Sequence, residues 1–189
     1  MPEAATRMTP VKDLLEEAAF IYCAKKRGKE REKVEKLVAQ SNLNKLNNFE
    51  ELKVYSGKTP HLVKEIVEHV AKLIKEDPSS AELVDLGEAT GITLAAGGVS
   101  KTQIMGFLDS VKSLKVGKLD NLNIARLRPQ LAYAVSRKNQ IEPLLAVLEP
   151  WFQKMKALNE EDLNSSFSDF SNFIETIVAF HCYYQEERG

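Results

Sequence analysis

Four residues in the second half of the chain have the types and the spacing to bind a polyanion. They recur at i, i+4, i+7 and i+11, which predicts one line along a helix face; they are Arg126, Gln130, Tyr133 and Arg137. No acid occurs in residues 121–140, whereas an exposed basic helix usually carries Glu four residues before Lys or Arg. We therefore expect these cations to be free for the phosphates of an RNA strand, with Arg128 and Lys138 beside them.

A second group of basic residues lies on the segment before this one. At about 100° per residue, these side chains fall along one edge of an apolar stripe; they are Lys101, Lys112 and Lys115, with Met105 among them. Ser100 and Gln103 match a capping box that starts the helix after Gly97-Gly98. Taken alone, this edge favours a solvated lysine face on an ordinary core helix, and only the second helix favours RNA binding.

Tyr133 lies between the two arginines and has two interpretations of equal weight. Its ring could stack on a base or pack on a sugar of bound RNA. Alternatively, it is a half-buried tyrosine of the protein core. Because both depend on how exposed the ring is, the sequence leaves the choice open.

Patterns for catalysis are missing from the sequence. Gly97-Gly98 lacks the Gly-Lys-Ser/Thr ending of a phosphate-binding loop. His61, His69 and His181 are isolated, and the acids at 159–162 abut in an expected loop. We therefore predict a protein that is not an enzyme, without catalytic residues, cofactor or metal.

Composition bounds the class of protein. The chain has 189 residues, 43% hydrophobic and 28% charged, with a net charge of −1, so any RNA-binding surface must be a local patch. Two cysteines far apart, Cys23 and Cys182, indicate a reducing cytosol. The N-terminus lacks the apolar stretch of a signal peptide, and no apolar run is long enough to span a bilayer. We expect a cytoplasmic protein with no membrane partner.

Helical periodicity predicts an all-α, compact bundle of about six or seven helices. Within it, Pro129 should kink or restart its helix, Asn139 should cap the next helix, and Ser166 should cap the last one. That last helix is apolar over more than half its circumference from Phe167 onward. It should therefore be central to the fold or half of an oligomer interface. We divide the chain into a helical extension of unknown role at 1–78 and a helical domain at 79–189.

Three segments in this order resemble the small subunit of type III-A CRISPR effector complexes, with the resemblance starting near Leu83. They are residues 99–107 (VSKTQIMGF), 127–137 (LRPQLAYAVSR) and 170–181 (FSNFIETIVAFH). The resemblance implies a helical, non-catalytic subunit that contacts the backbone of the guide–target RNA duplex, independently of sequence, during antiviral defence. It also implies assembly with backbone subunits and a large polymerase-like subunit.

Two positions depart from that resemblance, and one rival function stays open. The family often has a basic residue where Met105 stands, and Lys where Cys182 stands, which weakens the expected basic face. The rival is a helical adaptor that binds protein without touching RNA. The wide apolar face of the last helix favours it, because such a face fits self-association.

Overall fold

The computed structural model describes residues 59–116 and 121–185, which form six α-helices and one 3-10 turn, with no strand among them. The predicted all-α class is therefore confirmed. The elements are α4 (Thr59–Lys75), α5 (Ser80–Gly97), α6 (Lys101–Val116), α7 (Asn121–Arg137), η2 (Asn139–Ile141), α8 (Glu142–Lys156) and α9 (Glu160–Gln185). Most of the predicted N-terminal extension, residues 1–58, lies outside the described residues.

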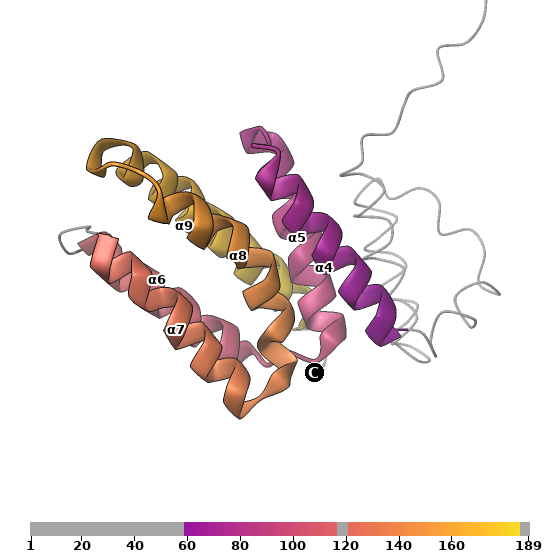
Figure 1. Ribbon diagram of the computed structural model, residues 1–189. Coiled ribbons are helices and arrows are strands. Elements are labelled where there is room, and N and C mark those ends of the chain that lie inside the picture. Colours follow the sequence, from indigo (N-terminus) through magenta and orange to yellow (C-terminus); the bar gives the residue numbers. More distant parts are fainter. Residues whose placement is uncertain (1–58, 117–120, 186–189) are drawn as a thin grey trace, which may run out of the picture.

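The helices lie in two layers of three. One layer holds α7, α8 and α4 in that order, and the other holds α6, α9 and α5 behind them (Figure 1). The pairs α4–α5 and α6–α7 contact each other across the layers. Helix α4, which precedes the predicted boundary at residue 78, packs closely on α8 and contributes Val63, Ile66 and Val70 to the common core.

The closest helix pair is α5 and α9, and two glycines allow it. A Cβ added at Gly91 would lie 2.8 Å from the Ile177 carbonyl oxygen and 2.9 Å from the His181 backbone nitrogen. A Cβ added at Gly87 would lie 2.6 Å from Thr176 Cγ2. Gly87 and Gly91 are four residues apart, so they share one face of α5. This spacing lets the backbones of α5 and α9 approach each other directly.

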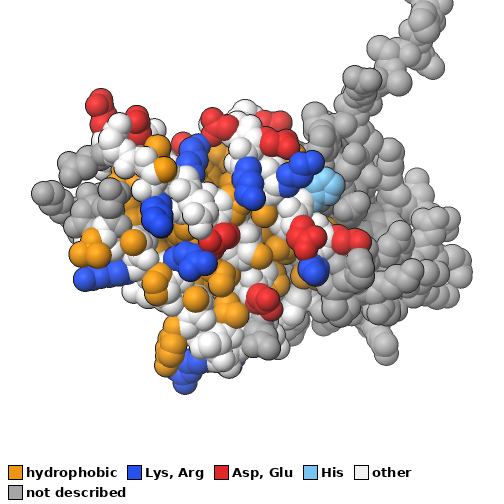
Figure 2. Space-filling view, viewed as in Figure 1, with side chains coloured by type: hydrophobic (Ala, Val, Ile, Leu, Met, Phe, Trp, Pro, Cys, Tyr) orange, Lys and Arg blue, Asp and Glu red, His pale blue; other side chains and the backbone are white. Residues whose placement is uncertain are grey.

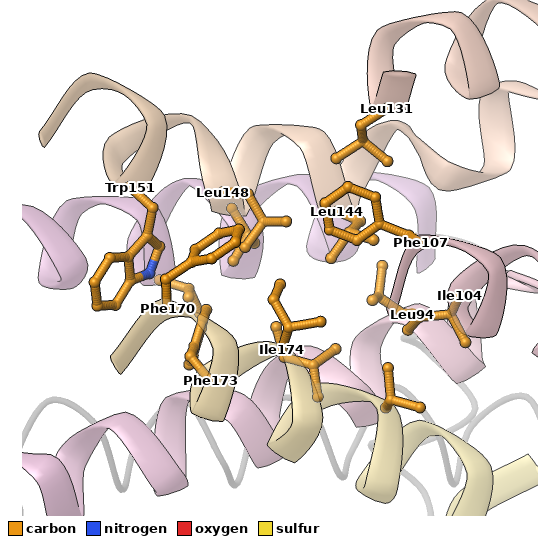
Figure 3. Close-up of a cluster of buried hydrophobic side chains, with 14 of the residues drawn as sticks. Leu94, Ile104, Phe107, Leu131, Leu144, Leu148, Trp151, Phe170, Phe173 and Ile174 are labelled. Atoms are coloured by element: carbon orange, nitrogen blue, oxygen red, sulfur yellow. The ribbon is translucent and has the colours of Figure 1, made fainter. Parts of the chain in front are cut away.

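Aromatic and branched side chains from all six described helices fill the space between the layers, and Figure 3 shows part of this core. Trp151 of α8 lies edge-on to Phe170 of α9, with ring centroids 5.9 Å apart, and 6.0 Å from Phe173. The apolar face of α9 packs in this core, where Phe170, Ile174 and their neighbours are buried within the molecule. Of the two roles expected for this helix, its buried apolar face shows the central one, while Tyr183 near its end remains 50% exposed.

Two helices start with a capping box, and the one at Ser100 follows the sequence prediction. Ser79 and Glu82 form a capping box at α5, and Ser100 and Gln103 form another at α6, since each exchanges a backbone–side-chain hydrogen bond with the other. Between them, Gly98 ends α5 in the left-handed conformation at φ 83°.

Two other predicted caps are wrong. Residues 139–141 form η2 instead, so α8 begins after Ile141 without a side-chain cap. Helix α9 begins at Glu160, seven residues before the start predicted from Ser166. The Asn159 side chain accepts a hydrogen bond from the Asp162 backbone at 2.9 Å. In addition, the negative charges of acids in a first turn interact favourably with the positive end of the helix dipole. The expected acidic loop is therefore the first turn of α9, and Ser166 is buried within the helix.

Candidate nucleic-acid interface

Helix α7 is continuous from Asn121 to Arg137 and passes through Pro129 without restarting. A proline inside a helix leaves the carbonyl four residues earlier without its N–H partner. Here Ala125 and Pro129 both lie on the exposed side, where water can bind that carbonyl. Because the helix does not restart, Arg126 and Arg137 remain on one line.

The four residues of this line, Arg126, Gln130, Tyr133 and Arg137, are all exposed. We call this surface the α7 line. Helix α7 packs its opposite flank, through Leu127 and Leu131, against the core. Within the described part of the chain, no carboxylate forms an ion pair with Arg126 or Arg137. Lys138 follows directly after α7 and is also exposed.

Tyr133 is 65% exposed, so its interpretation as a half-buried core residue is wrong. The Arg137 guanidinium carbon lies 5.9 Å from the centroid of its ring, within the range of a cation–π contact. The aromatic ring and the cation therefore face the solvent as a pair.

Arg128 does not belong to this surface. It lies two residues after Arg126, about 200° around the helix axis, and so points to the opposite side of α7. There its Nε donates to the Glu149 carboxylate of α8, 2.8 Å from Oε2. The prediction that Arg128 carries a free charge is therefore wrong. An acid-free stretch of sequence does not exclude a carboxylate from a neighbouring helix.

The basic edge of α6 is only partly described. Lys101 and Lys112 are exposed, while the side chain of Lys115 lies outside the described residues. Met105 is half-buried and packs on the core, as does Cys182 of α9. At both positions that depart from the family resemblance, the side chain therefore packs against the hydrophobic core. On the face shown in Figure 2, Lys and Arg side chains are spread among acids and do not form one continuous patch.

A groove of about 420 Å³ opens between α7 and α8, on the Arg128 side. Its floor is apolar, with Ile124, Phe152 and Met155, and Arg128 and Lys156 line it as well. Since this groove and the α7 line lie on different sides of one helix, α7 presents two chemically distinct surfaces.

Sequence reasoning missed Leu122, which belongs to the same face as the α7 line and is 63% exposed. Its position four residues before Arg126 is the signal that could have found it. For Glu149 no such signal exists, because it is 21 residues from Arg128 on another helix.

No group of three or more His, Cys, Asp or Glu side chains that could hold a metal occurs in the described segments. His69 is exposed on α4. His181 is fully buried, and its Nε2 lies 3.0 Å from the Val99 carbonyl oxygen. Since that oxygen only accepts, Nε2 carries the hydrogen and ties α9 to the turn before α6. None of the helices in these segments has both the length and the apolarity for crossing a bilayer.

Over the described segments, these features define an all-helical protein with an exposed cationic line on α7. The family model of type III-A Csm2 matches residues 76–187, which is more than half of the chain. The chain therefore belongs to the Csm2 family, the small subunit of type III-A CRISPR effector complexes. No curated protein and no solved structure matches it.

Proposed function

We propose that this chain is a non-catalytic subunit that binds the backbone of the guide–target RNA duplex through the α7 line, Lys138 and the exposed lysines of α6. In this role it works in the cytoplasm during antiviral defence, beside the backbone subunits and the large polymerase-like subunit. Backbone contacts position a strand without reading its bases, so binding should be independent of sequence.

One observation carries the proposal: Arg126 and Arg137 are exposed on one face of an unbroken helix, without an ion-pair partner in the described segments. They are eleven residues apart, or about 16 Å along the axis. A nucleic acid strand presents several phosphates over that length. Because the overall net charge is −1, the cationic surface can only be a local patch. This agrees with a subunit that binds RNA on one side only.

The test uses the full chain, a fully paired RNA duplex and a series of salt concentrations. Arg126→Glu combined with Arg137→Glu should abolish binding at near-physiological salt. It should also flatten the slope of log affinity against log salt by roughly 1.5, since each phosphate contact contributes about 0.7–0.9. Lys72→Glu with Lys75→Glu is the matched control, because these α4 lysines are exposed and the charge change is identical.

The control variant should bind like the wild type. Unchanged affinity of the Arg126/Arg137 double variant would show that this surface does not bind RNA.

The alternative is an adaptor that docks protein on the same face, and the exposed Leu122 side chain favours it. A chain that binds no RNA even at low salt, yet assembles with other effector subunits, would support this alternative.

A further inference from the structure

We infer that Tyr133 and Arg137 form a stacking site for one unpaired nucleobase. The RNA recognised by the α7 line would then be a strand with a base displaced from the duplex. This inference rests on the proposed function and specifies its ligand more closely.

The exposure of Tyr133 is unusual within this molecule. Large aromatic rings such as Trp151 and Phe170 are buried in the core, and Tyr184 is 2% exposed with its hydroxyl donating to Glu88 at 3.2 Å. Among the tyrosines of the described segments, Tyr183 is also exposed, but it lies against the Tyr184 ring, with centroids 5.2 Å apart. Tyr133 instead has a guanidinium beside it and 65% of its surface in solvent.

An exposed ring beside a cation suits a base better than a phosphate. Every nucleobase offers a π-face to an aromatic side chain, and an arginine adds cation–π attraction. Within a duplex these faces are covered by the neighbouring base pairs, except at its two ends, so along the helix only an unpaired base can stack on Tyr133. Phosphates flanking that base would then meet Arg126 and Arg137 on the same line.

The position of the ring along α7 supports this arrangement. Tyr133 lies about 6 Å along the axis from Arg137 and about 10 Å from Arg126. Cations therefore lie on both sides of the ring, where the backbone enters and leaves a displaced nucleotide. The core-packed flank of α7, with Leu127 and Leu131 buried, holds the helix rigidly behind the site.

The experiment compares two RNA probes with the full chain. One is a fully paired duplex, and the other is the same duplex with a single unpaired 2-aminopurine, whose fluorescence falls on stacking. Tyr133→Leu should weaken binding of the second probe roughly 5- to 150-fold, the range for one base–aromatic stack, and should abolish the quenching. The paired duplex should lose clearly less affinity, because it has no free base face inside the helix for Tyr133, and the difference between the two probes measures the stack.

Two further variants complete the design. Tyr133→Phe keeps the ring and should behave like the wild type, while Tyr183→Leu removes the exposed tyrosine of α9 and should change neither probe. An equal effect of Tyr133→Leu on both probes, or no effect on either, would overturn the stacking site. The proposed function fails separately, if Arg126→Glu with Arg137→Glu leaves paired-duplex affinity unchanged.

Discussion

The Arg128 guanidinium on α7 donates its Nε hydrogen to the Glu149 carboxylate on α8, 2.8 Å from Oε2 and 3.1 Å from Oε1. Gln153 donates to the same carboxylate at 2.8 Å. The hydrogen bond from Arg128 lowers the pKa of Glu149 and raises that of Arg128. Both groups are therefore held charged, and Arg128 serves the α7–α8 contact while Arg126 and Arg137 face solvent.

This pairing predicts a difference between two arginines of one helix. Arg128→Ala should change RNA affinity less than about twofold, because its charge is already balanced by Glu149. Arg137→Ala should weaken binding clearly, since a phosphate contact is lost. Fluorescence anisotropy with a paired RNA at constant salt measures both variants. A larger loss for Arg128→Ala than for Arg137→Ala would show that Arg128 leaves Glu149 to bind RNA.

The cost of Arg128→Ala to stability should also be small. The two side chains are 52% and 33% exposed, and solvent-exposed ion pairs contribute little to stability. Urea unfolding of the variant should therefore show a midpoint close to that of the wild type, so that any effect on RNA binding is local.

The sequence predicted those features that depend on local spacing. The all-α class and the capping box at Ser100 each need only residues within one turn of one another. The single line from Arg126 to Arg137 depends on the helix period in the same way, once Pro129 is known not to interrupt it.

Features that depend on contacts between helices could not be predicted from the sequence. Glu149 neutralises Arg128 from another helix, and the exposure of Tyr133 depends on which flank of α7 meets the core. The start of α9 was missed for a different reason. Asn159 and Ser166 are both good N-cap residues; in the structure Asn159 caps the helix, and Leu163 after it is buried at 1% exposure.

Two glycine substitutions should have opposite effects on stability. Gly91→Ala places a Cβ 2.8 Å from the Ile177 carbonyl oxygen, so α5 and α9 must separate. Overpacking of this kind costs about 1–3 kcal/mol. Gly106→Ala in α6 meets nothing within 4 Å and should stabilise the protein by about 0.5–1 kcal/mol through helix propensity. Thermal unfolding measures both, and a stabilised Gly91→Ala variant would contradict the close α5–α9 contact.

Glu88 should make stability depend on pH in the opposite sense to Glu149. Burial raises the pKa of Glu88, although the Tyr184 hydroxyl lowers it in part and Asp85 adds a smaller rise. A raised folded-state pKa contributes stability below the ordinary value of about 4.5, and this is lost as pH rises through the folded-state pKa. Glu88→Gln keeps an acceptor for Tyr184 and should raise the midpoint of thermal unfolding at pH 7 while leaving it nearly unchanged at pH 4.

For Glu149 the pKa is lowered, so its contribution is present above about 4.5 and is lost as pH falls through the folded-state value. Glu149→Gln should therefore destabilise at pH 7 and matter less at low pH. If both glutamine variants shift stability in the same direction at pH 7, the assignment of burial to Glu88 and pairing to Glu149 is wrong.

The start of α9 can be tested with two alanine substitutions. Asn159→Ala removes the side chain that accepts from the Asp162 backbone and donates to its carboxylate, both at 2.9 Å. The loss of such a cap costs about 1 kcal/mol. Ser166→Ala should be neutral or stabilising, because its buried hydroxyl has no hydrogen-bond partner in the described structure and an unpaired buried polar group is unfavourable. Chemical unfolding of the two variants measures the difference, and a greater loss for Ser166→Ala would place the helix start at Ser166 after all.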